Sequence, residues 1–115
     1  MAIIGAHVLL YTPQAEQLRA QHREVFGWKH VDAGDGWLIF ALPPAELGVH
    51  PSEDDTNHQL SLLCDDVAAT ANELRGKGVE VRGDPEDKGF GVGVTLVLPG
   101  GVEVLLYEPR HETAI

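Results

Sequence analysis

The sequence contains a single cysteine, Cys64, and no long apolar run. One cysteine cannot form a disulfide within the chain, which is consistent with a reducing cytoplasm. We expect Cys64 to be a small apolar residue inside a strand, because no basic residue flanks it to activate the thiol. No apolar stretch approaches the roughly 20 residues of a membrane-spanning helix, and the first residues do not resemble a signal peptide. These absences predict a cytoplasmic protein without a membrane partner.

Basic residues are also scarce. Eight lysines and arginines stand against 18 acidic residues, which gives a formal net charge of −10. Such a surface repels phosphate groups, so nucleic acids and anionic membranes are excluded as expected partners. The acidity either keeps the protein in solution or attracts cationic ligands and metal ions, and composition alone does not separate these interpretations. The length of 115 residues suits one core, and the 43% of hydrophobic residues is typical of a globular domain.

Glycine and proline divide the chain into two halves with the same order of expected elements. The first half predicts, after an N-capping Thr12, a helix over 14–26, with strands over 7–11, 28–31, 37–42 and 45–50. The second half predicts a helix that Asp65 or Asp66 caps and Gly78 ends, a loop over 83–91, and strands over 59–64, 79–82, 92–98 and 102–107. We therefore expect one domain over residues 1–115: module one at about 1–51, a linker at about 51–57, module two at about 58–109 and a tail at 110–115.

Alternating side chains predict which face of each strand is buried. In the last strand, the apolar residues Val102, Val104 and Leu106 oppose Glu103, Leu105 and Tyr107, and three other strands show the same division. We expect the apolar faces to pack beneath the helices and the mixed faces to line a shared hollow. The predicted fold class is α+β, with two βαβββ modules that form a curved mixed sheet around a concave cup, and with the helices on its outer face.

Three segments together resemble a known family. They are HVLLYTP at 7–13 before a helix that ends in VFGW, then LSLLCDDVAATANELRGKGVEV at 60–81, and LPGGVEVLLYEP at 98–109. Their order and spacing resemble the vicinal oxygen chelate superfamily, which includes glyoxalase I, extradiol dioxygenases, fosfomycin-resistance enzymes and bleomycin-resistance proteins. The resemblance covers nearly the whole chain. It implies a cup-shaped site, often completed by formation of a homodimer, and in many members a divalent metal that polarises an oxygen-rich substrate.

The resemblance also implies four positions for metal ligands. The first is His7, the second is Glu46 or His50, and the third is Gln59, or His58 if a bulge turns it inward. Without a gap the fourth position falls on Leu105, which cannot bind metal, whereas Glu103 lies two residues earlier on the same face. This set suits Ni, Mn, Fe or Zn without distinguishing them, and the cofactor is either one such ion or none.

The resemblance and the composition lead to three hypotheses about function, and they leave open whether the protein is an enzyme. In the first, it is a glyoxalase-like or dioxygenase-like enzyme whose metal polarises a small oxygen-rich substrate, with Glu103 as a ligand or a catalytic base. In the second, it is a metal-free protein that sequesters a small drug or metabolite, cationic or neutral, as bleomycin-resistance proteins do, and so serves antibiotic resistance. The third is a structural or regulatory module that only keeps the fold. The side chains expected to bind the small-molecule ligand are Tyr11, Trp37, Ser61, Phe90, Thr95 and Tyr107.

Overall fold

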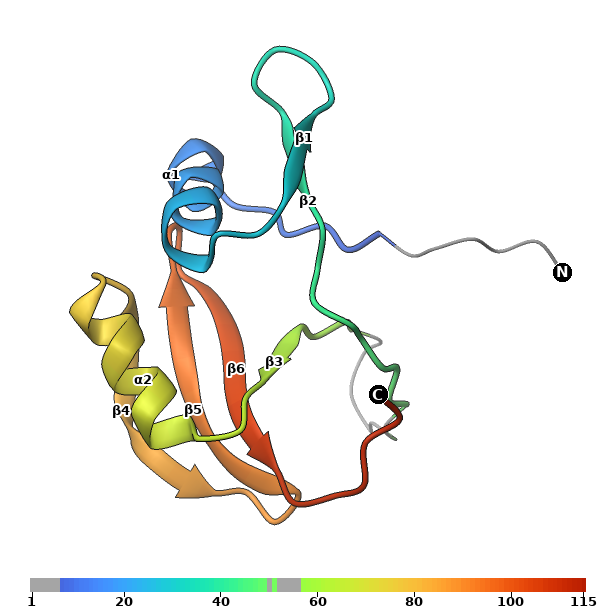
Figure 1. The fold of residues 1–115 in the computed structure, drawn as a ribbon, viewed down its shortest axis with the longest axis vertical. Helices are drawn as coiled ribbons and strands as arrows, with labels where there is room; N and C mark the ends of the chain where they lie inside the picture. Colours follow the sequence, from blue (N-terminus) through green and yellow to red (C-terminus); the bar gives the residue numbers. More distant parts are fainter. Residues whose placement is uncertain (1–6, 50, 52–56) are drawn as a thin grey trace, which may run out of the picture.

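The computed structural model describes residues 7–49, 51 and 57–115, and in each half of the chain a helix is followed by strands. In those residues it contains two α-helices, a π-helical turn and six strands, arranged as one two-stranded and one four-stranded sheet (Figure 1). The larger sheet is mixed, because one of its strand pairs is parallel and the others are antiparallel. The predicted α+β class is therefore confirmed. Among the described residues, no helix has the length and apolar character needed to cross a membrane.

The second half of the chain forms a complete βαβββ unit. Its elements are β3 (Ser61–Leu63), α2 (Val67–Gly76), β4 (Glu80–Asp87), β5 (Gly91–Leu98) and β6 (Val102–Pro109). The strand order is β3-β6-β5-β4, with β3 parallel to β6 and the other pairs antiparallel. The carboxylate of Asp66 accepts a hydrogen bond of 3.0 Å from the Ala69 backbone N–H, so Asp66 is the helix cap rather than Asp65.

The core lies between this sheet and the helices. On α2, Val67, Ala71 and Leu74 are buried at helical spacing. On the strands, Leu96 and Val104 are fully buried, while neighbouring residues of β6 such as Glu103 face solvent. The alternation predicted for the last strand is thus confirmed, and it gives the sheet one face against α2 and one face that α2 leaves uncovered.

Strand β4 is longer than the sequence predicts. The expected loop over 83–91 is wrong, since β4 continues through Asp87 and leaves only a short turn before β5. A register shift between Arg82 and Glu86 accommodates Gly83, whose φ of 72° lies in the left-handed region, and Pro85. Because β4 is an edge strand, a proline there costs it no partner.

The first half contains α1 (Ala15–Gln21), the π-helical turn η1 (His22–Phe26) and a hairpin of β1 (His30–Asp32) with β2 (Leu38–Phe40). Gly27 ends the helical segment in the left-handed conformation, as expected. The predicted cap at Thr12 is wrong, because Gln14 is the N-cap residue. The Thr12 hydroxyl accepts from the Gln14 N–H at 3.2 Å and donates to the Pro99 carbonyl at 2.9 Å, which ties the first half to the β5–β6 turn.

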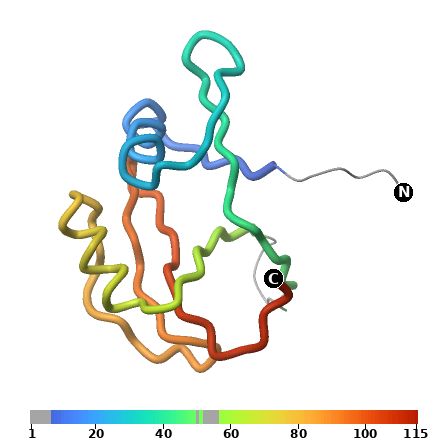
Figure 2. Tube along the Cα trace, in the orientation of Figure 1, coloured from blue at the N-terminus to red at the C-terminus, as the bar shows by residue number. Residues whose placement is uncertain are grey.

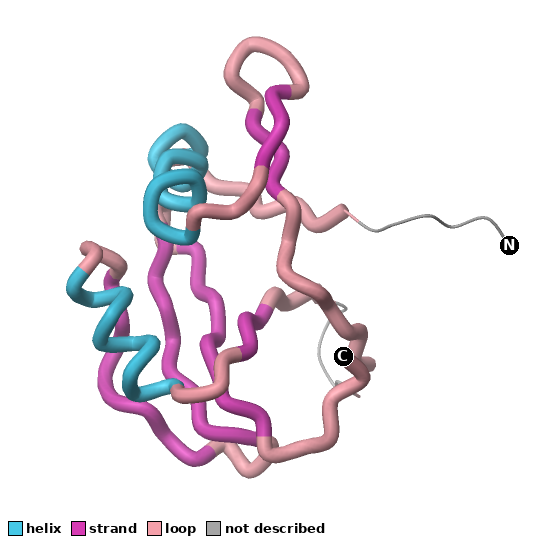
Figure 3. The backbone as a smooth tube through the Cα atoms, viewed as in Figure 1, coloured by secondary structure: helices cyan, strands magenta, loops and turns pink. Residues whose placement is uncertain are grey.

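Two predicted strands do not form. Residues 7–11 and 45–49 are irregular, whereas His50, the end of the second predicted strand, lies outside the described residues (Figure 3). A strand needs a neighbour for its N–H and C=O groups, and β1 and β2 pair only with each other. The C-terminal residues run beside the second segment, where the Ala114 N–H donates to Glu46 at 2.7 Å (Figure 2). Leu47 and Val49 remain 90% and 91% exposed.

Candidate functional site

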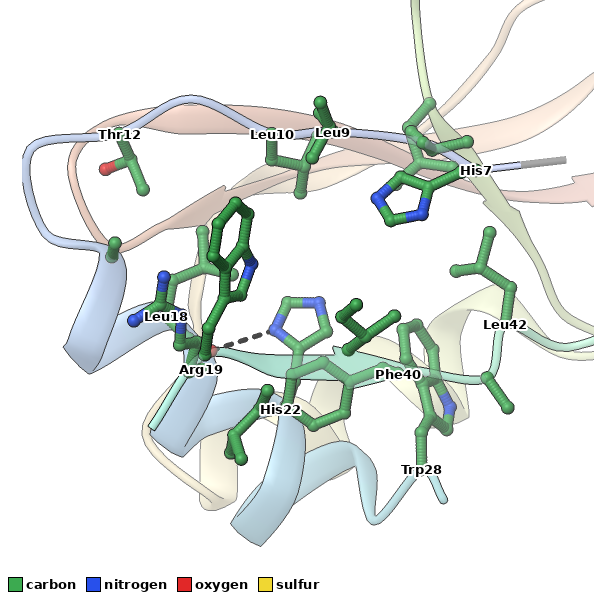
Figure 4. A pocket seen from close by; sticks show the side chains of 17 residues that line it. His7, Leu9, Leu10, Thr12, Leu18, Arg19, His22, Trp28, Phe40 and Leu42 are labelled. Atoms are coloured by element: carbon green, nitrogen blue, oxygen red, sulfur yellow. Dashed lines mark hydrogen bonds between the residues drawn. The ribbon is translucent and has the colours of Figure 1, made fainter. Parts of the chain in front are cut away.

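A cavity of about 330 Å³ lies in the first half, between the N-terminal segment 7–12, α1 and β2. Its lining is mostly aliphatic and aromatic, and its polar side chains apart from the indoles are His7, Thr12, Arg19 and His22. Figure 4 shows the His7 and His22 rings projecting from opposite walls towards the same space. This size and this lining are typical of a site for a small organic molecule.

His22 is the most buried polar side chain of the site, with 6% of its surface exposed. Its Nδ1 donates a hydrogen bond of 2.9 Å to the Leu18 carbonyl one helical turn earlier. The rings of Phe26, Trp28 and Phe40 surround it, with centroids 5.1, 5.2 and 5.5 Å from its own. Burial lowers the pKa of the His22 imidazole below its ordinary value of 6.5, so the ring is neutral at physiological pH.

Arg19 supplies the positive charge of the cavity. Its side chain is half-buried, and it makes no ion pair with any residue that the structure describes. Glu16, one turn earlier on α1, borders a neighbouring hollow rather than the cavity itself. The described lining contains no aspartate or glutamate. The cavity is therefore locally cationic or neutral, although the chain as a whole carries −10.

The metal ligands that the sequence predicts are dispersed. His7 lines the cavity, whereas the Glu46 carboxylate accepts the hydrogen bond from the C-terminal segment. Glu103 lies on β6, where it forms an exposed ion pair of 2.5 Å with Arg82. Its role as a catalytic base stays a prediction. Gln59 is exposed, and His50 lies outside the described residues.

A divalent metal needs several donors around one point. In residues 7–49, 51 and 57–115, no group of three or more histidine, cysteine, aspartate or glutamate side chains is placed to hold one. The described part of a single chain thus does not fit the metal that the resemblance implies. The ligand set stays a prediction.

The side chains predicted to bind a ligand divide into two groups. Trp37 lines the cavity, while Tyr11 is exposed and outside its lining. Ser61 and Thr95 both lie opposite Leu105 in the sheet register, on the face that α2 leaves uncovered. Both belong to the four-stranded sheet, and neither lines the cavity.

Tyr107 and Phe90 lie with this second group. Their rings meet edge to face with centroids 5.2 Å apart, and the Tyr107 hydroxyl contacts His111 Nε2 at 3.0 Å. Burial, and then the negative charge of Glu46, raise the pKa of the Tyr107 phenol, so it remains protonated. In the single chain the uncovered sheet face therefore carries an aromatic pair of its own.

Comparison with known proteins decides the family. A model of the Glyoxalase/Bleomycin resistance protein/Dioxygenase superfamily matches residues 5–109. The chain belongs to this superfamily. A search of curated protein sequences finds no significant match.

Several solved structures have a similar fold. TnmS3, an antibiotic binding protein from Streptomyces sp. CB03234, is 24% identical with a TM-score of 0.69, over 96% of this chain and 99% of that one. A lactoylglutathione lyase from Agrobacterium tumefaciens is 18% identical with a TM-score of 0.63, over 93% and 92%. The fosfomycin resistance protein FosX from Listeria monocytogenes is 14% identical with a TM-score of 0.59, over 96% and 94%.

The sequence reasoning missed the most buried polar residue of the cavity. His22 follows Ala15 and Leu18 at helical spacing, so its position on the buried stripe of the first helix is readable from the sequence. A histidine on such a stripe indicates a buried imidazole. Arg19 gives no comparable signal, because an arginine on an amphipathic helix is ordinarily solvated.

Proposed function

We propose that this member of the superfamily binds a small, flat aromatic molecule in the cavity of its first half. The observation that carries the proposal is the aromatic part of the lining, in which Trp28 and Phe40 pack against the neutral His22 and Trp37 lines the same cavity. Aromatic walls favour a flat ring, which stacks against them or meets them edge to face. The cavity volume of about 330 Å³ suits a ligand of two or three fused rings. The description of TnmS3 as an antibiotic binding protein agrees with a binding role in this fold.

The charges of the cavity favour a neutral or anionic ligand. Arg19 is the local cation, and the described lining contains no carboxylate to attract a basic drug. The net charge of −10 acts in the opposite sense, but salt screens exposed charges beyond about 8 Å at physiological ionic strength. The groups inside the cavity therefore decide the preference, and they do not favour the cationic ligand that was one interpretation of the acidic composition.

A metal-dependent reaction of the glyoxalase type stays a prediction from the sequence. It requires His7, Glu46 or His50, Gln59 and Glu103 to meet, and the described side chains among them do not meet within one chain. Binding of an aromatic molecule requires only the cavity. Sequestration is therefore the function that the geometry supports best.

Calorimetric titration with three naphthalene derivatives tests the proposal. We expect naphthoate and neutral methoxynaphthalene to bind at physiological salt, and naphthylmethylammonium to bind about tenfold more weakly than naphthoate. Arg19→Gln should weaken naphthoate binding about fivefold, because it removes the half-buried guanidinium that donates a charge-assisted hydrogen bond to the naphthoate carboxylate. The affinity for methoxynaphthalene should not change. Arg23→Gln, which breaks only the exposed Arg23–Glu24 pair, is the control. Absence of binding by all three probes contradicts the proposal.

We further propose that two copies of the chain associate through the segments 7–11 and 41–49. No strand within residues 7–49 and 57–115 pairs with these segments, and they carry one charged residue, Glu46, in a strongly acidic chain. They expose Val8, Leu47 and Val49. The radius of gyration is 15.1 Å, against roughly 13 Å for a compact domain of this length. A second copy would supply the missing strand partners and cover the apolar side chains.

Light scattering coupled to size-exclusion chromatography measures this association. We expect the native protein to elute with twice the mass of one chain, and the double variant Leu47→Asp/Val49→Asp to elute as a monomer, since two buried carboxylates without partners oppose the interface. Val31→Asp places a charge on the exposed β1–β2 hairpin and should leave the dimer intact. A native monomer at every concentration used would rule out the interface.

A further inference from the structure

The second ring nitrogen of His22 is a polar atom that the fold does not use. Nδ1 carries the proton, because its partner, the Leu18 carbonyl, can only accept a hydrogen bond. Nε2 of the neutral ring is therefore an acceptor. No residue in the described part of the chain donates a hydrogen bond to it.

The surroundings fix where this acceptor points. Phe26, Trp28 and Phe40 pack around the ring with centroids within 5.5 Å, and the imidazole projects into the cavity (Figure 4). Their π-faces offer no strong donor in place of an N–H or O–H group. The His22 residue as a whole is 6% exposed, and Nε2 faces the cavity, so the molecule that occupies the cavity supplies its hydrogen-bond donor.

From this geometry we propose that Nε2 of His22 accepts a hydrogen bond from a hydroxyl group on the bound aromatic molecule, so that the site selects phenols. The inference rests on the proposed function and adds a substrate class to it. A phenol suits both the aromatic lining and the Nε2 acceptor, since its ring packs against the aromatic walls and its O–H is a strong, uncharged donor. An aryl ether of the same shape lacks the proton and leaves Nε2 unpaired.

Alternative partners for Nε2 fit the site less well. A carboxylate has no proton to donate, and it would set its charge against the lone pair. An ammonium group would donate, but no described carboxylate lines the cavity to balance its charge there. Arg19 remains available to an oxygen elsewhere on the ligand, which is compatible with a hydroxyaryl acid or a hydroxyquinone as well as with a simple phenol.

Calorimetric titration with naphthol and its methyl ether tests the inference. We expect the native protein to bind naphthol about tenfold more tightly than the ether, the gain of one well-placed hydrogen bond in a mostly apolar cavity. His22→Phe keeps a ring among its aromatic neighbours and removes both nitrogens, so it should bind the two probes equally. His22→Asn retains a donor near the position of Nδ1 but lacks Nε2, and it should lose the preference in the same way.

His30→Phe is the matched control. The His30 ring also contacts Phe40, at 5.5 Å, but it is exposed and does not line the cavity, so its loss should leave the preference intact. The ring-nitrogen NMR spectrum of histidine-labelled native protein adds a measurement that depends on no variant. We expect the Nε2 resonance of His22 to shift with naphthol and not with the ether.

The outcomes separate the two claims. If native protein binds both probes equally, or if the preference survives in His22→Phe and His22→Asn, the role of His22 is overturned while aromatic binding stands. An unchanged Nε2 resonance on naphthol binding overturns it as well. If native protein binds neither probe, both the inference and the proposed function fail.

Discussion

Replacement of Gly100 with alanine is expected to lower the free energy of unfolding by about 3 kcal/mol, roughly twice the effect of the same change at Gly101. Both glycines lie in the β5–β6 turn with similar left-handed backbones, with φ of 88° and 80°. An alanine at either position therefore pays the same backbone penalty. Only at Gly100 would the added Cβ collide with a neighbour, the Thr12 hydroxyl, whereas at Gly101 it meets nothing within 4 Å.

The collision matters because it occurs where the two halves of the chain meet. Thr12 donates to the Pro99 carbonyl and also lines the cavity, so displacing it disturbs the cavity wall. Urea denaturation measures the stability of both variants, and titration with methoxynaphthalene measures their affinity. We expect Gly100→Ala to lose affinity and Gly101→Ala to keep it. Thr12→Ala should partly rescue Gly100→Ala by removing the hydroxyl, and equal destabilisation at both glycines would contradict the predicted contact.

The second half of the fold could be predicted from its sequence almost completely. Its helix and strands have local signals, namely an aspartate cap, glycine stops and strict alternation, and each strand finds its partner within the same half. The exception is β4, where Gly83 and Pro85 indicate a loop by composition. An edge strand tolerates both residues through a bulge, and edge position is a property of the whole sheet rather than of the segment.

The first half shows the limit of local reasoning. Segments 7–11 and 45–50 have strand-like sequences, but a strand exists only when a neighbour completes its hydrogen bonds, and the described chain offers none. The candidate site could also be predicted only in part. His7 and Trp37 do line the cavity, whereas His22 was missed although it follows Ala15 and Leu18 on the buried stripe of the first helix. Its three aromatic neighbours come from the helix end, the following loop and β2, and only tertiary packing brings them together.

Shortening Leu96 to alanine is expected to cost 2–5 kcal/mol of unfolding free energy, the usual range for a buried leucine. Leu96 is fully buried at the centre of β5, among α2 and β6 side chains such as Ala71 and Val104. The loss has two parts, the transfer free energy of the removed methyl groups and the cavity that rigid neighbours leave behind.

Leu105→Ala is the matched control for this change, because it removes the same atoms from the opposite face of the sheet. Leu105 is only half-buried in the single chain, and we expect the change there to cost about 1 kcal/mol. Urea denaturation of both variants at low protein concentration checks the difference. If the two changes cost the same in the monomeric Leu47→Asp/Val49→Asp background, the assignment of the core to the α2 side of the sheet is wrong. If Leu105→Ala becomes costly only in the native background, a second copy covers the face that carries Leu105, Thr95 and Ser61.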